Sequence, residues 1–368
     1  MMARKFLRPT VPTLSRLLAT NLTTLSLILA SVIPVAFPLD LAAQSRSEIT
    51  TLSDENKDSV VGGPTGLPAH LVSVPTRSDY YLPYIFVVDK TARSLEIWKS
   101  EVSANGQRQF IRSAAYPADL GRRTGDKVSE GDHKTPEGIY FLLSKLEGST
   151  LDFKLYGSRA YTTDYPNHFD SLDGKTGSGI WLHSVPDDVP LTRGSRGCVV
   201  VRNDIVKTLD PYIRVGRTPI VISEKVEKRS IVEMEASQAK LEKWLESWRS
   251  TWETKSLDDY MKFYDEDFET LKMKKADWRT YKSRLGEKYS QISVKISQPL
   301  ALEQRGRAVV RFVQSYSSSG ISDLGEKTLH LVNRKGEWKI ISETWRPDDS
   351  AAARAAVSTE PTTKTAAF

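Results

Sequence analysis

The stretch WLHSVPDDVPLTRGSRGCVVV, residues 181–201, combines a strand pattern with two reactive side chains. Its two ends are short apolar runs typical of strands, and the loop between them is rich in Pro, Asp and Gly. His183 ends the first run and Cys198 opens the second. If these strands are neighbours, the imidazole comes within hydrogen-bond reach of the thiol, as nucleophilic chemistry by cysteine requires. Gly194 and Gly197 allow a tight turn, and the N–H groups of Gly197 and Cys198 are candidates for holding an oxyanion.

Cys198 is the single cysteine among 368 residues, and the N-terminus indicates an exported chain. Residues 1–43 contain basic residues, an apolar run at 25–37 and small residues before a polar segment, which is the pattern of a signal peptide. An uncleaved N-terminal membrane anchor is the alternative, although this run is shorter than the roughly 20 residues that span a bilayer. Outside the cytoplasm, a leftover cysteine is either buried and inert or a reactive thiol. We therefore expect a location in the periplasm or the cell wall.

The charge balance does not point to nucleic acid. The formal net charge is +6, and residues 1–43 supply +3 of it, from Arg4, Lys5, Arg8 and Arg16 against Asp40. The remaining +3 is too small, and too evenly spread, for a nucleic-acid interface.

Composition divides the chain into segments. Residues 44–78 are polar and turn-rich, and we expect a linker. Residues 79–224 alternate short apolar runs with Gly, Pro and Asp turns, which predicts a mainly β domain with short helices. Residues 225–346 show helical periodicity followed by a strand meander, which predicts an α+β domain. The Ala-, Thr- and Ser-rich end, 347–368, is expected to be disordered.

Several motifs around the opening stretch occur in a characteristic order. They are GDHKTPEGIY at 131–140, YPN at 165–167, IWLH at 180–183 and SRGCV at 195–199. In this order they resemble the L,D-transpeptidase (YkuD-type) catalytic domain of bacterial peptidoglycan enzymes, over about residues 83–224. The resemblance implies a mixed β-sandwich in which Cys198 is the acylated nucleophile and His183 its base. It also implies that the backbone carbonyl of Ser184 orients the imidazole.

Two positions depart from the S-H-G-C-x-R pattern that is common in that family. Arg196 stands at the second histidine and Val200 at the arginine, so one contact to the substrate peptide is missing. We interpret Ser195, Arg196 and Arg202 as candidate substrate-binding residues, and we add His168, which follows YPN on a predicted substrate-side loop. The S-x-G-C form without that arginine also occurs in family members that hydrolyse rather than cross-link.

The resemblance implies peptidoglycan stem peptides as the substrate. The thiol would attack the L-centre carbonyl of the third residue, usually meso-diaminopimelate, and expel the terminal D-Ala. Transfer to an amine makes the protein an L,D-transpeptidase, and transfer to water makes it an L,D-carboxypeptidase. An inactive wall-binding scaffold is an alternative of another class. No cofactor is implied, and the scattered histidines show no metal-ligand spacing.

Residues 240–346 have a resemblance of their own. The segments WRSTWETKSLDDYMKFYDEDF at 248–268 and EWKIISETW at 337–345 are similar to the cone-shaped SnoaL-like (nuclear-transport-factor-like) fold. Such domains often bind ligands or dimerise. We therefore expect residues 225–346 to offer a surface for a protein partner or a second copy of the chain.

Overall fold

The computed structural model of the protein describes residues 66–358, apart from 77 and 193. The expected signal segment at 1–43, much of the linker and the end of the tail lie outside the described residues. Within the described part of the chain, no helix is both long and apolar enough to cross a membrane.

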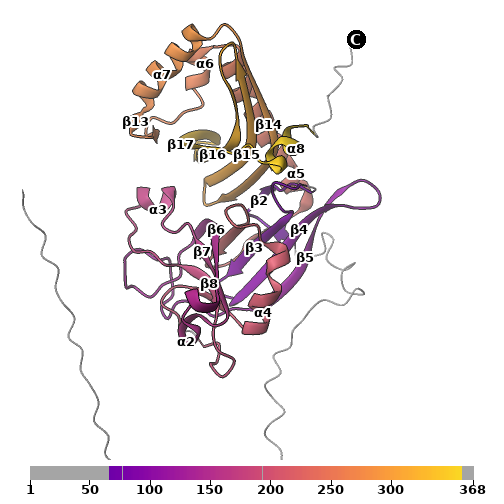
Figure 1. Ribbon diagram of the computed structural model, residues 1–368, viewed down its shortest axis with the longest axis vertical. Helices are drawn as coiled ribbons and strands as arrows, with labels where there is room; N and C mark the ends of the chain where they lie inside the picture. Colours follow the sequence, from indigo (N-terminus) through magenta and orange to yellow (C-terminus); the bar gives the residue numbers. More distant parts are fainter. Residues whose placement is uncertain (1–65, 77, 193, 359–368) are drawn as a thin grey trace, which may run out of the picture. The chain divides into compact units, whose positions relative to one another are not determined.

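The first domain is built on a mixed eight-stranded sheet with the order β5-β4-β3-β10-β6-β7-β8-β9 (Figure 1). Two neighbouring pairs, β3–β10 and β8–β9, are parallel, and the others are antiparallel. The strands are β3 (Tyr84–Asp89), β4 (Ser94–Val102), β5 (Arg108–Pro117), β6 (Gly138–Glu147), β7 (Arg159–Thr163), β8 (Trp181–Ser184), β9 (Val199–Val201) and β10 (Pro219–Ser223). The short helices are α2 (Phe153–Tyr156), α3 (His168–Leu172) and α4 (Asn203–Thr208), with 3₁₀ turns η2 (Gly148–Thr150) and η3 (Asp210–Tyr212).

The central strand β3 is buried on both faces, which explains its continuous apolar sequence. Phe86 and Val88 join the core of the first domain. Ile85 and Val87 point to the opposite face and join a core that also contains residues of the second domain. A mainly β first domain was expected, and the structure confirms it.

The second domain packs three helices against one face of an antiparallel sheet of order β17-β16-β15-β14-β2 (Figure 1). Its helices are α5 (Ile231–Glu253), α6 (Leu257–Met261) and α7 (Lys275–Lys288). Its long strands are β14 (Ile292–Gln304), β15 (Arg307–Ser318), β16 (Ser322–Arg334) and β17 (Glu337–Pro347), and a small hairpin joins β12 (Glu269–Thr270) to β13 (Met273–Lys274). Ser230 caps α5 with a capping box, and Trp248 on that helix is fully buried. The expected α+β domain is therefore present.

Segments outside the expected domain bounds contribute to the core. Strand β2 (Leu71–Ser73), in the expected linker, pairs with β14, and β1 (Leu67–Pro68) pairs with β11 (Lys228–Arg229). In the expected disordered tail, residues Ala351–Ser358 form α8, which buries Ala353 and Ala356. Alanine contributes little apolar surface, so composition indicates disorder. Its small side chain nevertheless allows α8 to pack closely on the sheet.

Candidate active site

Strands β8 and β9 bring the two expected reactive residues to one cavity. The strands are parallel neighbours, with Leu182 opposite Val199 and His183 opposite Val200. Cys198 directly precedes β9, so it lies diagonally across from His183. Both residues are buried, and both line a cavity of about 630 Å³. The expected neighbourhood of these strands is confirmed.

The imidazole of His183 is held in one orientation. Its Nδ1 lies 2.7 Å from the backbone carbonyl oxygen of Ser184, the contact that the family resemblance implies. A carbonyl can only accept a hydrogen bond, so Nδ1 carries the proton and Nε2 keeps a free lone pair. Burial lowers the pKa of His183, and the Ser184 carbonyl opposes that shift. The Tyr156 ring packs edge-on against the imidazole at 5.2 Å. The imidazole is thus neutral at neutral pH, and its Nε2 is able to accept a proton.

The thiol of Cys198 is also neutral at rest. Its Sγ donates to the backbone carbonyl of Gly179 at 3.4 Å. Burial raises the pKa of Cys198 to about 11, while a backbone hydrogen bond from Trp181 and the charge of Lys127 partly oppose the increase. In the structure as described, the thiol therefore bonds to a carbonyl rather than to the imidazole. Hydrogen bonds of this kind often form fully only when substrate is bound.

The turn before Cys198 is closely packed. Gly197 has a φ of 129°, and a Cβ there would lie 2.6 Å from the carbonyl oxygen of Lys134. Only glycine fits this position without a shift of the neighbouring backbone. The Ser195 hydroxyl donates to the Cys198 carbonyl at 2.8 Å and accepts from the Gly197 N–H at 3.0 Å. The Gly197 N–H, one of the two expected to hold an oxyanion, is therefore engaged by Ser195 in this structure.

The remaining candidate binding residues separate into two groups. Ser195 and Arg196 line the cavity. Arg202 is outside the lining and donates to the carbonyl of the lining residue Val189 at 2.7 Å. His168 lies outside the lining, and its ring packs at a tilt of 45° against His330 of the second domain, with the ring centroids 5.0 Å apart. At position 200 the cavity wall is a buried valine instead of the family's arginine.

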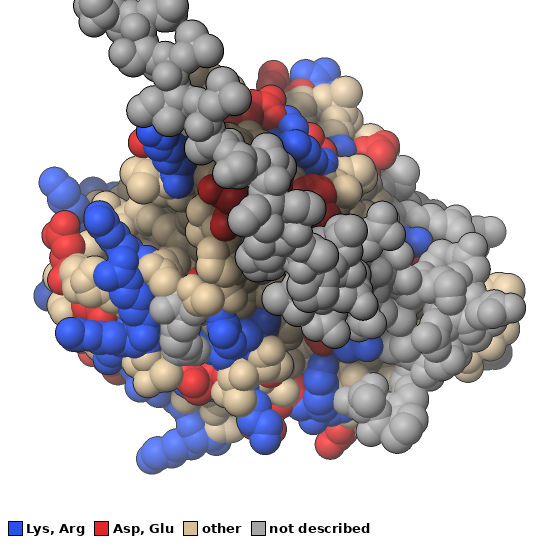
Figure 2. Space-filling model, turned by 90° about the horizontal axis from the view of Figure 1, so that it is seen from below, with Lys and Arg blue, Asp and Glu red and all other residues tan. Residues whose placement is uncertain are grey.

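Other lining residues were not singled out by sequence pattern. They include Arg122, whose Nε donates to the Gly194 carbonyl at 3.0 Å, and Tyr156. Lys127 is nearly buried and donates to the Ser129 carbonyl and to Asp132, each at 3.0 Å. The spacing of Lys127 and Asp132 in DKVSEGD gives no periodic signal, because the chain folds back here as a loop. Viewed from below, the molecule shows Lys and Arg side chains beside acidic and uncharged ones (Figure 2).

The second domain contains a different cavity, of about 260 Å³. Lys282 lines it and lies over the rings of Trp252, Trp278 and Tyr260, at 3.9, 4.7 and 5.5 Å. Burial lowers the pKa of Lys282 to about 7. Nearby, buried Glu343 pairs with Lys327 at 2.5 Å and accepts from the hydroxyl of Tyr264 at 2.8 Å. Burial opposes ionisation of Glu343, but the two lysines outweigh it and lower its pKa.

A metal centre is not indicated. Within residues 66–358, as far as the structure describes them, no group of three or more His, Cys, Asp or Glu side chains is placed to hold a metal ion.

The comparisons with known proteins agree with this geometry. The family model of the L,D-transpeptidase catalytic domain (YkuD) matches residues 83–222, and that of the Cds6 C-terminal NTF2-like domain matches residues 240–344. The chain is therefore an L,D-transpeptidase-fold enzyme, and this fold is associated with peptidoglycan.

Two solved structures share both domains. Bd1075 from Bdellovibrio bacteriovorus is 42% identical, with a TM-score of 0.68 over 77% of this chain and 99% of that one. The helical cell shape determining protein Pgp2 from Campylobacter jejuni is 26% identical, with a TM-score of 0.57 over 75% of this chain and 96% of that one. No curated protein sequence matches the chain. The chain belongs to the YkuD L,D-transpeptidase family, and within it to the proteins that carry a C-terminal NTF2-like domain.

Proposed function

We propose that the chain is an exported peptidoglycan L,D-transpeptidase that works through an acyl-enzyme on Cys198. The observation that carries this proposal is the shared cavity of Cys198 and His183, in which the Ser184 carbonyl leaves Nε2 of the imidazole free to accept a proton. The proposed substrate is a stem peptide that ends in D-Ala. Export rests on the pattern of residues 1–43.

In the first half-reaction the thiol leaves the Gly179 carbonyl and gives its proton to His183 Nε2. Sulfur attacks the L-centre carbonyl carbon of the third residue, and the carbonyl oxygen becomes an oxyanion. The bond from that carbon to the D-Ala nitrogen then breaks. His183 returns the proton to the departing amine, so D-Ala leaves neutralised and a thioester remains on Cys198.

In the second half-reaction an incoming nucleophile gives its proton to His183 and attacks the thioester carbon. The thiolate leaves and takes the proton back. An amine from another stem peptide produces a 3–3 cross-link, whereas water produces a tripeptide. Both outcomes use the same two side chains, so the acceptor and the exclusion of water decide between them.

Hydrolysis, as an L,D-carboxypeptidase, is the second candidate. The observation that favours it is Val200, a buried apolar residue where cross-linking family members have an arginine. The lysine and arginine side chains that do line this cavity are Arg122, Lys127 and Arg196.

The test is to incubate the purified protein with diaminopimelate-containing tetrapeptide muropeptides and to identify the products by mass spectrometry. Dimers with 3–3 cross-links establish the transpeptidase. Tripeptides with released D-Ala and no dimers establish the carboxypeptidase. Cys198→Ala, checked for an unchanged melting temperature, is the control and should form neither product. If wild type and Cys198→Ala give the same mixture, the enzyme proposal is wrong and the scaffold alternative takes its place.

A further inference from the structure

A turn of the second domain reaches the catalytic domain beside the TPEG motif. Strands β14 and β15 are joined by Arg305 and Gly306, with φ values of 52° and 72°, and Gln304 pairs with Arg307 across the turn. Two consecutive positive φ angles make this a tight two-residue hairpin. Gln304 donates to the Ile222 carbonyl at 2.9 Å and to the Ser223 hydroxyl at 2.8 Å, both on β10 of the first domain.

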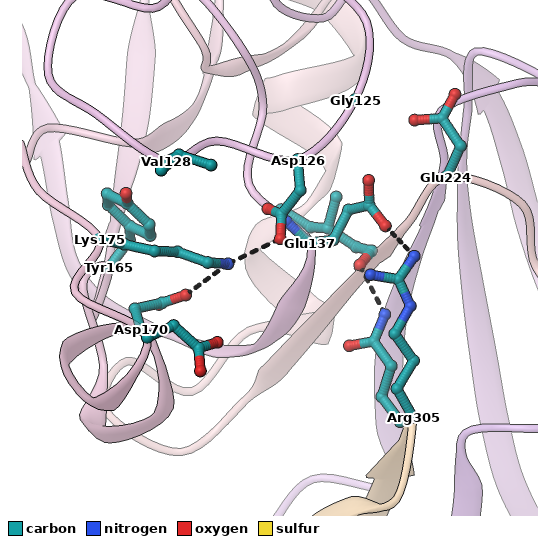
Figure 3. Close-up of polar contacts among 12 residues, drawn as sticks. Gly125, Asp126, Val128, Glu137, Tyr165, Asp170, Lys175, Glu224 and Arg305 are labelled. Carbon is teal, nitrogen blue, oxygen red and sulfur yellow. Dashed lines mark hydrogen bonds and ion pairs between the residues drawn. The ribbon is translucent and has the colours of Figure 1, made fainter.

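Arg305 forms an ion pair with Glu137, the glutamate of the TPEG motif (Figure 3). The Glu137 side chain is only 3% exposed, and its other oxygen accepts from Lys90 at 2.9 Å. Lys90 also lies 2.9 Å from Glu224. One buried lysine thus faces two carboxylates, and Arg305 supplies the second positive charge. Without that arginine, Glu137 would keep a buried charge that is only partly compensated.

The segment that Arg305 holds packs directly on the turn carrying Cys198. The Thr135 hydroxyl accepts a hydrogen bond from the Gly121 N–H at 2.8 Å, which holds the TPEG motif, residues 135–138, against the segment around Gly121. The Lys134 carbonyl lies against Gly197, where even a methyl group would not fit. A displacement of the TPEG motif would therefore be transmitted to the thiol turn.

Arg307 holds a second loop, residues 173–180, which leads into the wall of the Cys198 cavity. It forms a bidentate pair with Asp173, at 2.6 and 2.7 Å. A few residues further on, the N–H of Thr176 donates to the Val128 carbonyl and its hydroxyl accepts from the Glu130 N–H, both at 3.0 Å. The same loop leads to Gly179, whose carbonyl accepts the Cys198 thiol. Both arginines thus reach segments that contact the thiol turn.

A polar cavity of about 250 Å³ lies between this hairpin and the first domain. Its charged side chains are paired with one another. Lys175 lies between Asp126 and Asp170, at 2.8 and 3.0 Å, as Figure 3 shows, and the two arginines take Glu137 and Asp173. Such complete pairing is typical of a structural network rather than of a binding site for a charged ligand.

We propose that Arg305 and Arg307 are positioning residues for the reaction at Cys198, supplied by the second domain. They act by holding the loops at 126–138 and 173–180, and neither needs to touch substrate. The NTF2-like domain is then part of the catalytic apparatus as well as a separate module. Only the kinetic test of this inference depends on the proposed function.

The test compares the full-length Arg305→Gln/Arg307→Gln variant with wild type and with Arg334→Gln. Arg334 is the matched control, because it is a half-exposed arginine paired with buried Asp265 inside the second domain. We expect kcat for muropeptide turnover to fall about tenfold in the double variant, with KM little changed, because loop misplacement affects the reacting geometry. Arg334→Gln should keep the wild-type kcat. Arg305→Lys, which retains the charge, should keep kcat within about twofold of wild type.

A second readout does not depend on substrate. Cys198 is the single cysteine, so the rate of iodoacetamide labelling reports directly on its surroundings. Looser loops should expose the thiol and raise that rate about fivefold in the double variant but not in Arg334→Gln. If wild type turns over no muropeptide, the proposed function fails while the labelling comparison still decides the positioning role. Wild-type labelling in the double variant, or losses of kcat that Arg334→Gln reproduces, would overturn the inference.

Discussion

Two buried clusters of this molecule, one around Cys198 and one around Glu343, hold their titratable side chains in opposite ways. In the first domain, Cys198 and His183 have backbone carbonyls as their hydrogen-bond partners, and burial keeps both side chains neutral. In the second domain, Glu343 is buried together with Lys327 and Lys282, and its charge is retained because the lysines compensate it. A carbonyl orients a group without fixing its charge, so the first pair can exchange a proton during a reaction. A close counter-ion fixes the charge, so the second cluster contributes to structure.

The contrast between the Cys198–His183 pair and the Glu343 cluster depends most on His183 acting as a base. We expect His183→Gln to lower kcat by about 10³-fold, because proton transfer by a positioned base contributes on the order of 10²- to 10⁴-fold. The melting temperature should change little, since the neutral amide can replace the contact to the Ser184 carbonyl. Steady-state kinetics on muropeptides measure the effect. A variant with near wild-type kcat would show that the imidazole is only a packed side chain.

Substitutions in the Glu343 cluster should change the stability of the protein instead of its activity. We expect Glu343→Gln to lower the free energy of unfolding by about 3–5 kcal/mol, because it leaves buried Lys327 without its counter-ion. Chemical denaturation measures the change. Exposed Glu337, which pairs with Lys339, is the control, and Glu337→Gln should leave the denaturation midpoint unchanged. Equal effects of the two substitutions would mean that burial does not distinguish these pairs.

Lys282 tests the same cluster through pH. Its pKa is about 7 in the folded state against a usual 10.5, so between these values the unfolded chain binds a proton that the folded chain does not. The wild-type protein therefore loses stability as the pH falls from about 10.5 to 7, by up to about 1.4 kcal/mol per unit. Lys282→Met avoids this loss, and we expect a gain on the order of 2 kcal/mol at pH 7 that disappears toward pH 10.5.

Urea denaturation of wild type and Lys282→Met at several pH values provides that measurement. A difference that does not vary with pH would assign the effect of the substitution to packing instead of charge.

The smallest effect sharpens the description of the thiol. We expect iodoacetamide labelling of Cys198 to keep rising with pH up to about 11, because the thiolate reacts and burial raises the pKa to that value. In the same protein unfolded in urea, the labelling rate should level off near the usual pKa of cysteine. A plateau below pH 8 in the folded protein would indicate a preformed thiolate–imidazolium pair, and the contrast with the second domain would then be smaller.

Sequence predicted what depends on local pattern. Adjacent β8 and β9 were expected from the short apolar runs around His183 and Cys198, and a helical segment such as α5 from the periodicity within residues 225–346. The ion pair of Arg305 with Glu137 joins residues 168 positions apart, and neither position carries a pattern that indicates the other. Likewise, the engagement of the Gly197 N–H by Ser195 depends on a side-chain rotamer, which motif spacing does not specify. Tertiary contacts of this kind have to be seen in the structure.

The pairing of β2 with β14 has a consequence for biosynthesis. Leu71 and Leu302 are partners in this sheet, so the catalytic domain is enclosed within the chain between two strands of the other domain. A nascent chain emerging from its N-terminus cannot complete that sheet until residues near 302 have been made. Until then, residues 71–73 are an unpaired apolar segment, and an unpaired edge invites association with other chains. Completion of the second domain's sheet is therefore a late, long-range event.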